Sequence, residues 1–194
     1  MEFISELTRA MIALFIVVDP FGNIPIFMGL TENATDAERT KTFNTAILIS
    51  VILLLVFAFT GTGILTIFGI SIYSFYVAGG ILLLIIAIRI LITGSMHEDA
   101  ESPESLGAVP IAMPLLVGPG AITTTILDLQ TYSVTITVLA VLIVLAITWV
   151  ILRFINQIYK LLGKTGSLVI ARVMALLIAA IAVQYILTGV THFV

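Results

Sequence analysis

The sequence contains no cysteine, which excludes disulfide bonds, thiol chemistry and thiolate metal sites. Histidine is nearly absent, and the "HED" run at His97 lacks the second histidine of a metalloprotease motif. No basic cluster is present, and the net charge of −3 suggests no nucleic-acid partner. We therefore expect no enzyme, no metal or other cofactor, and no contact with nucleic acid.

Charged residues are scarce as well. They make up 10% of the 194 residues, whereas soluble domains carry about 25%. Four long stretches carry no Asp, Glu, Lys or Arg: 42–88, 105–127, 129–152 and 173–194. Each of them exceeds the roughly 20 apolar residues that cross a bilayer core. The sequence therefore predicts an all-α membrane protein that crosses the bilayer several times.

Apolar periodicity predicts six spans within a single transmembrane domain, with boundaries accurate to a few residues. The predicted spans are residues 7–30, 42–60, 72–94, 109–131, 135–154 and 169–191. An acidic linker at residues 95–108 separates the third span from the fourth. The apolar start of the first span could be read as a secretory signal. The flanking Glu2 and Glu6 are acidic and no small-residue cleavage site follows, so we expect a retained span.

The two halves of the chain resemble each other. Pro20 and Pro25 recur 94 residues later as Pro114 and Pro119. The run "IRILITG" that ends at residue 94 recurs as "VQYILTG", which ends at residue 189. Two matches at nearly the same offset predict an internal repeat, with residues 1–95 as the first unit and 109–194 as the second. Because each unit has three spans, the second would be inverted, as in many secondary transporters.

The distribution of Lys and Arg predicts the orientation in the membrane. The first, third and fifth loops share one side, and that side carries most of the basic residues. These residues are Arg39, Lys41, Arg89, Arg153, Lys160, Lys164 and Arg172. The other side has Arg9 alone. We therefore expect a multi-pass protein of the cell membrane, the inner membrane in a bacterium, with both termini outside.

Helix-breaking residues interrupt the first span at "DPFGNIPIF". Pro20 and Pro25 each remove a backbone N–H and clash with the preceding turn, and Gly22 and Asn23 have weak helix propensity. We expect one half-helix to end near Asp19 and another to begin near Pro25, since proline suits the first helical position.

The fourth span repeats this interruption as "MPLLVGPGAITTT", which contains Pro114, Gly118 and Pro119. Pro119 would open a second half-helix and leave the N–H groups of Gly120, Ala121 and Ile122 without helical acceptors. Non-helical backbone at membrane depth is tolerated only where it is buried in protein or lines a cavity.

An inverted repeat would bring the two interruptions together near the bilayer midplane. Free N–H groups at helix N-termini suit a carboxylate, and the carboxylate of Asp19 suits an ammonium group. The aliphatic surroundings favour a small zwitterion with a neutral side chain. The predicted substrate-binding residues are Asp19, Gly22, Asn23, Gly118, Gly120, Ala121 and Thr123. Asp19 is also the candidate coupling residue, and its alternative role is to cap the second half-helix.

At these residues the sequence resembles the MarC family of bacterial and archaeal inner-membrane proteins. The resemblance rests on "DPFGNIPIF" at 19–27, "AGGILLLIIAI" at 78–88, "MPLLVGPGAI" at 113–122 and "ARVMALLIAAIAVQYILTG" at 171–189. It implies six spans arranged as an inverted repeat. For the SnatA branch it also implies gradient-driven transport of glycine, alanine and similar amino acids, coupled to protons or sodium.

Other polar residues have simpler expected roles. Arg89 should snorkel to the interface, and solvent should reach Asp128 at the outer end of its span. Interhelical hydrogen bonds are the expected role of Asn44 and Gln184, against lining a pathway. Arg172 would either snorkel or bind the central region.

Two small-residue motifs also lie within spans. Thr123, Thr124 and Thr125 would bond their own helix carbonyls, although one of them could reach a ligand. Gly79 and Gly80 should allow close helix packing.

Three other classes of function compete with transport. A channel or pore would need a continuous polar file along several spans, and the sequence shows only a short polar zone. A membrane assembly protein without transport activity is the second rival. Under each of these alternatives the expected surroundings are the lipid bilayer, and an oligomer is possible. An enzyme that uses Asp19 and Asp128 as a dyad is the third, but the two residues are expected at different depths.

Overall fold

The computed structural model describes residues 2–31, 34–93 and 116–192, and these ranges contain helices but no strand. The helices are α1 (Glu2–Val18), α2 (Ile24–Leu30), α3 (Asp36–Ile67), α4 (Ile72–Thr93), α6 (Pro119–Thr131), α7 (Val134–Arg153) and α8 (Ile155–Val190). The expected all-α class is confirmed. The predicted linker at 95–108 and Pro114 lie outside the described residues.

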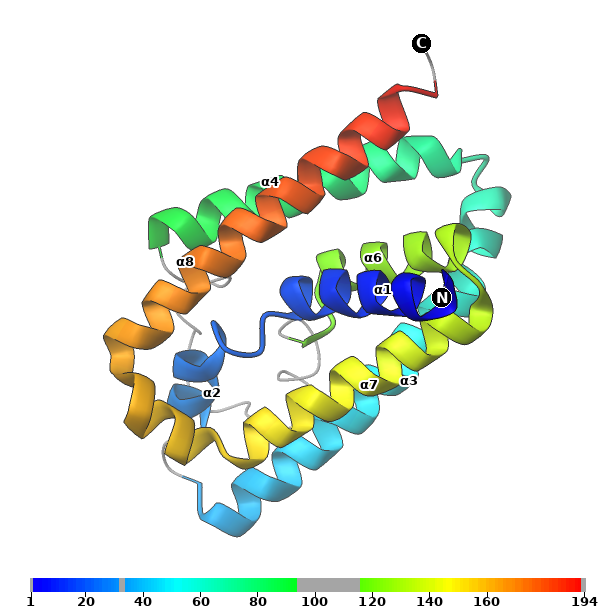
Figure 1. Cartoon of the computed structure of the whole chain (residues 1–194). Helices are drawn as coiled ribbons and strands as arrows, with labels where there is room; N and C mark the ends of the chain where they lie inside the picture. Colours follow the sequence, from blue (N-terminus) through cyan, green and yellow to red (C-terminus); the bar gives the residue numbers. More distant parts are fainter. Residues whose placement is uncertain (1, 32–33, 94–115, 193–194) are drawn as a thin grey trace.

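The helices form three layers (Figure 1). In one outer layer α4 runs along α8, and in the other α3 runs along α7. Between them lie α1 and α6, which contact each other and both outer layers, and α2, which packs on α8. The core of the protein therefore lies around α1 and α6, where the outer layers enclose the shorter helices.

Within the described residues, four helices are long and apolar enough to cross a membrane: α3, α4, α7 and the part of α8 at Thr165–Val190. The spans predicted at 42–60, 72–94, 135–154 and 169–191 each fall on one of them. Helices α1, α2 and α6 are shorter, because the chain is non-helical at 19–23 and again at 117–118.

Local sequence signals set the ends of α3. At its start Thr35 and Glu38 form a capping box, in which the Glu38 N–H donates to the Thr35 hydroxyl and the Thr35 N–H donates to the Glu38 carboxylate. At its end Gly69 adopts a φ of 65°. The N–H of Ile70 donates to the carbonyl of Leu65 at 2.8 Å, as in a Schellman motif that turns the chain toward α4.

A bend divides α8 into two parts. Gly163 has φ 62° and ψ −176°, values outside the helical region, so residues 155–162 form a separate segment before the long membrane helix. This segment was not predicted from the sequence. It lies at the same end of the molecule as α2 and the start of α3 (Figure 1).

Glycines allow the backbones of α4 and α8 to approach closely. A Cβ added at Gly80 would lie 2.6 Å from the carbonyl oxygen of Ala182, and one added at Gly189 would lie 2.6 Å from that of Tyr73. A Cβ at Gly79 would collide with the Thr123 methyl group. The predicted close packing at Gly79 and Gly80 is therefore confirmed.

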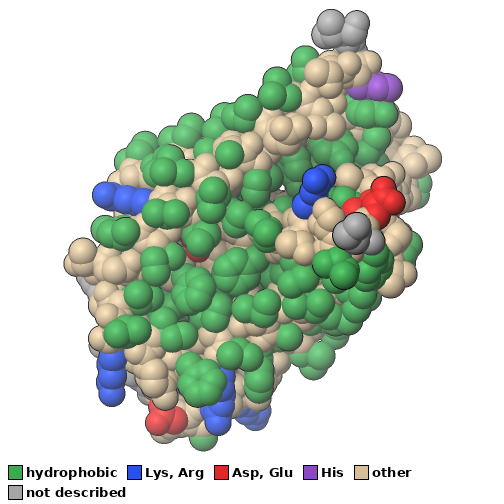
Figure 2. Space-filling view, viewed as in Figure 1, with side chains coloured by type: hydrophobic (Ala, Val, Ile, Leu, Met, Phe, Trp, Pro, Cys, Tyr) green, Lys and Arg blue, Asp and Glu red, His purple; other side chains and the backbone are tan. Residues whose placement is uncertain are grey.

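Outward-facing surfaces of the long helices are apolar. Phe59 on α3 is 56% exposed and Leu176 on α8 is 60% exposed, and many Ile, Val and Leu side chains accompany them. Hydrophobic side chains cover most of the visible face, whereas Lys and Arg side chains gather mainly at its left and lower edges (Figure 2). Such a surface suits lipid better than water.

Candidate functional site

The interruption between α1 and α2 is buried. Asp19 follows the last residue of α1, is 2% exposed and has a φ of 43°, which is rare outside glycine but more accessible to Asp and Asn than to most residues. Pro20 opens the turn that follows, and Pro25 occupies the first turn of α2. The chain thus leaves one helix and enters the next within five residues, close to the predicted positions.

Asp19 organises this turn. Its Oδ1 accepts a hydrogen bond of 3.0 Å from the N–H of Gly22. A Cβ at position 22 would collide with the Asp19 carboxylate, so the turn requires glycine there. Across the described part of the chain, no other hydrogen bond or ion pair to this carboxylate is recorded. The bond from Gly22 that the capping alternative predicted is therefore observed, but it closes the turn before α2, whose N-cap residue is Asn23. Oδ2 accepts no hydrogen bond from the described residues.

Asn23 closes the turn from the other side. Its side-chain Nδ2 donates to the carbonyl oxygens of Val18 and Asp19, each at 3.1 Å. The Val18 carbonyl belongs to the last residue of α1, and the Asp19 carbonyl also accepts the backbone N–H of Asn23 at 3.2 Å. Asn23 is 2% exposed. The Asn23 side chain therefore stabilises the interruption and does not cap α2.

The start of α6 lies against the end of α1. Gly118 is the extended N-cap residue and Pro119 is the first helical residue. The N–H of Ile122 donates to the carbonyl of Gly118 at 3.1 Å, so the expectation that this group lacks an acceptor was wrong. For Gly120 and Ala121, no acceptor is recorded among the described residues. The N-terminus of α6 thus keeps two N–H groups for a ligand.

A small cavity of about 20 Å³ lies at this junction. Its lining comes from α1, α4, α6, α8 and the N-cap of α6, and consists of Val17, Leu83, Ile86, Gly118, Gly120, Ala121 and Ile178. The structure therefore brings Gly118, Gly120 and Ala121 together with the end of α1. Asp19, Gly22, Asn23 and Thr123 do not line this cavity. A volume of this size holds about one water molecule.

The three threonines that follow have different surroundings. Thr125 donates to the carbonyl of Ala121 at 2.8 Å, as expected for a residue that bonds its own helix. The methyl group of Thr123 faces Gly79 on α4. The Thr124 hydroxyl is fully buried and forms no hydrogen bond of good geometry with the described residues, although the Tyr185 side chain lies close to it. Of the three, Thr124 is the one whose hydroxyl is both fully buried and unsatisfied.

Asp128 requires a correction. We expected solvent to reach it, but the residue is 6% exposed. It lies in the last turn of α6, where Tyr76 of α4 and Tyr185 of α8 cover this end of the helix. The sequence position indicated the depth of Asp128 but not the aromatic residues that bury it.

Other polar expectations have mixed outcomes. Asn44 accepts a 2.7 Å hydrogen bond from the Trp149 indole N–H, so the predicted interhelical bond between α3 and α7 is confirmed. The prediction was wrong for Gln184, whose recorded bond goes to Thr188 on the same helix. Arg89 lies near the end of α4, and its snorkelling remains a prediction. Arg172 is exposed, which favours the interfacial alternative over the central one.

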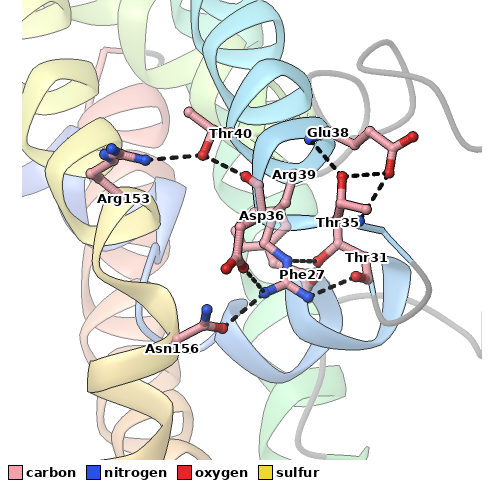
Figure 3. Close-up of polar contacts among 9 residues, drawn as sticks. All are labelled: Phe27, Thr31, Thr35, Asp36, Glu38, Arg39, Thr40, Arg153 and Asn156. Carbon is pink, nitrogen blue, oxygen red and sulfur yellow. Dashed lines mark hydrogen bonds and ion pairs between the residues drawn. The ribbon is translucent and has the colours of Figure 1, made fainter.

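A network centred on Arg39 was not anticipated. Its guanidinium donates to the hydroxyl and the carbonyl of Thr31, at 3.0 and 2.8 Å, and to Oδ1 of Asn156 at 2.9 Å (Figure 3). The exposed carboxylate of Asp36 lies 3.8 Å away. Arg39 thereby connects the end of α2 and the start of α3 to the first segment of α8.

The Arg39 network borders a polar groove of about 370 Å³ between α3, α7 and α8. Arg153 spans part of the groove and donates to the Thr40 hydroxyl at 3.0 Å (Figure 3). The capping box at Thr35 was readable from the sequence, but the pairing of Arg39 with Asn156 joins residues 117 positions apart. No sequence signal indicates such a pairing.

Long apolar helices, lipid-suited outer faces and a buried polar interruption define an integral membrane protein of helical class. The model of a family described as "MarC family integral membrane protein" matches residues 4–194. The chain belongs to this family, and the resemblance drawn from the sequence motifs is confirmed.

Several curated relatives are similar over nearly their full lengths. A UPF0056 membrane protein of Archaeoglobus fulgidus is 36% identical, with 98% of this chain and 94% of the relative covered. A UPF0056 membrane protein of Escherichia coli is 38% identical, with 92% and 89% covered. Another, of Methanocaldococcus jannaschii, is 38% identical, with 98% and 89% covered. No solved structure matches.

Proposed function

We propose that this protein is a secondary transporter of small neutral amino acids such as glycine and alanine, driven by a proton or sodium gradient. The observation that carries the proposal is the buried junction of two helix ends. The end of α1 contacts the start of α6 through Val17 and Gly120. Asp19, which follows α1, has an Oδ2 atom that accepts no hydrogen bond from the described residues, and the N–H groups of Gly120 and Ala121 have no acceptor among them.

The chemistry of this junction matches a zwitterion. A carboxylate suits the two N–H groups and the partial positive charge at the start of α6, which is 13 residues long. An ammonium group suits Asp19, the acidic residue of the interruption. Leu83, Ile86 and Ile178 offer only aliphatic contacts to the substrate side chain. A neutral side chain of small size is therefore favoured over a charged or aromatic one.

The packing supports an inverted repeat of two three-helix units. In such a repeat α1 corresponds to α6, α3 to α7 and α4 to α8, so each contact in one half should have a counterpart in the other. The α1–α7 contact has its counterpart in α6–α3, and the α4–α6 contact has its counterpart in α8–α1. The pairs α1–α6, α3–α7 and α4–α8, which also occur, are their own counterparts. A pseudo-twofold relation between the halves produces this pattern. Six crossings follow if the interrupted segments at 7–30 and 109–131 each count as one.

The size of the cavity favours a carrier over a channel. A space for about one water molecule cannot hold an amino acid, so the outer layers must separate for substrate to enter. The α4–α8 pair is held by close backbone contacts and would move as one body. Rocking of such a pair around a central site is the usual form of alternating access.

The proposed orientation of the protein in the membrane follows from the positions of its basic residues. Arg39, Arg153 and Lys160 belong to the end of the molecule where α2, α3 and α8 meet, and this end would face the cytoplasm. Both termini would then lie outside. Because the chain lacks cysteine, single cysteines at Ser5 and Gln157 can be tested with an impermeant thiol reagent on intact cells. Labelling of Gln157→Cys without labelling of Ser5→Cys would reverse the orientation.

Uptake of labelled glycine by purified protein in liposomes tests the function. Saturable uptake that alanine inhibits, and that arginine or tryptophan does not, is the expected result. Uptake that rises linearly with glycine concentration would indicate a pore. Uptake no greater than in protein-free liposomes, under both proton and sodium gradients, would refute the proposal.

A further inference from the structure

A second buried polar site lies in the last turn of α6, away from the helix interruption. Asp128 is 6% exposed, and no hydrogen bond or ion pair to its carboxylate is recorded in the described part of the chain. One turn earlier, the fully buried Thr124 hydroxyl forms no hydrogen bond of good geometry with the described residues, although the Tyr185 side chain lies close to it. Residues four positions apart share one face of a helix, so both groups point toward the same space.

Aromatic hydroxyls from two other helices enclose this space. Tyr185 of α8 lies beside Thr124 and within electrostatic range of Asp128. Tyr76 of α4 packs edge-on against Tyr185, with ring centroids 5.6 Å apart, and its hydroxyl is 2.8 Å from that of Thr131. Tyr132, which follows α6, is also within electrostatic range of Asp128. The site therefore offers oxygen atoms and aromatic rings but no basic partner.

Two charged residues of α1, Arg9 and Glu6, lie near Tyr132 at the edge of this site and act on it with opposite signs. On α3 no charged residue follows Lys41, and on α7 none precedes Arg153, which are residues of the opposite end. On α8, Tyr185 lies near Asp128, and Tyr76 of α4 packs against Tyr185. Within residues 2–31, 34–93 and 116–192, no Lys or Arg side chain forms an ion pair with the Asp128 carboxylate.

We propose that Asp128, with the Thr124 and Tyr185 hydroxyls, binds the monovalent cation, a proton or a sodium ion, that drives transport. This proposal rests on the proposed transport function. An unpaired carboxylate in an apolar interior is costly, and a small bound cation removes that cost. Because Asp128 must bind a cation before it can be buried, the helices around it can close only when that cation is bound.

Asp19 is less suited to this task, because its Oδ1 already accepts the Gly22 N–H and fixes the turn. Its charge is better placed to hold the substrate ammonium. The two buried carboxylates then have separate roles, with Asp19 at the substrate and Asp128 at the cation. Binding of either ligand would favour the same packed arrangement of α4, α6 and α8, which couples them.

Two assays on the same liposomes separate these roles. The first is exchange of labelled for unlabelled glycine without any ion gradient, and the second is accumulation under an imposed proton or sodium gradient. Asp128→Asn keeps the size and polarity of the side chain and removes its ability to take up a cation. It should exchange glycine as the wild-type protein does and lose accumulation to the level of protein-free liposomes. Asp36→Asn, at an exposed position, is the matched control and should retain both activities.

Each outcome bears on the proposal. Accumulation by Asp128→Asn at the wild-type level would overturn it, as would equal loss of exchange and accumulation in folded protein. If Asp128→Asn fails to fold, Thr124→Val takes its place and should weaken the apparent affinity for the driving cation about fivefold, as one hydrogen bond predicts. An unchanged affinity would overturn the site. The gradient that drives wild-type accumulation identifies the cation, and wild-type protein without any exchange would instead refute the transport function.

Discussion

Gly80→Ala should destabilise the contact between α4 and α8, although alanine is the better helix former. The added methyl group would lie 2.6 Å from the Ala182 carbonyl oxygen and 3.0 Å from the Ile186 nitrogen. Both atoms belong to the backbone of a continuous helix and cannot rotate away. Overpacking of this kind costs about 1–3 kcal/mol, and the gain in helix propensity offsets about 0.8–1 kcal/mol of it.

Gly63→Ala is the matched control, because a Cβ at Gly63 would meet nothing within 4 Å. It gains the same propensity without the collision, so the difference between the two variants isolates the packing cost of about 1–3 kcal/mol. Thermal unfolding of both variants in one detergent measures it, at roughly 2–4 °C per kcal/mol for a chain of this length. Equal melting temperatures would refute the close packing of α4 on α8.

Three further predictions follow from other contacts. Arg39→Ala removes three hydrogen bonds and should lower the free energy of unfolding by about 3 kcal/mol, whereas Lys41→Ala, at an exposed position, should change it little. Similar denaturation midpoints for the two variants would argue against the Arg39 network. Gly22→Ala should displace the Asp19 carboxylate and reduce glycine exchange far more than Gly29→Ala, where a Cβ meets nothing; equal rates would separate the turn from transport. Ile178→Val enlarges the cavity and should let larger neutral amino acids compete better with glycine in an exchange assay. Ile136→Val, at a buried position outside the cavity, should not have this effect.

Much of the fold was predictable because membrane insertion imposes strong constraints on the sequence. Long charge-free runs indicated α3, α4, α7 and the long part of α8, and each lies where it was expected. The interruption at Asp19 was predictable because proline and glycine act locally. Gly79 and Gly80 indicated close packing for the same reason, since a missing side chain has a direct steric consequence.

The features that escaped prediction depend on contacts between distant residues. Burial of Asp128 requires tyrosines from α4 and α8, and sequence position alone suggested a solvent-exposed residue. The pairing of Arg39 with Asn156 depends on how the first segment of α8 folds back after α7. That segment ends at Gly163, and nothing in the sequence distinguishes this glycine, which has a positive φ, from the other glycines of the chain.

The central claim is that the buried interruption at Asp19 holds the substrate of a transporter. Exchange of labelled glycine by wild-type protein and by Asp19→Asn, reconstituted side by side, tests it most directly. Asparagine can keep the positive φ and accept the Gly22 hydrogen bond, so the variant should fold while losing the charge that binds an ammonium group. We predict alanine-sensitive exchange by the wild-type protein and its loss in Asp19→Asn at an unchanged melting temperature. Exchange by Asp19→Asn at the wild-type rate would contradict the claim and leave Asp19 with its structural role in the turn alone.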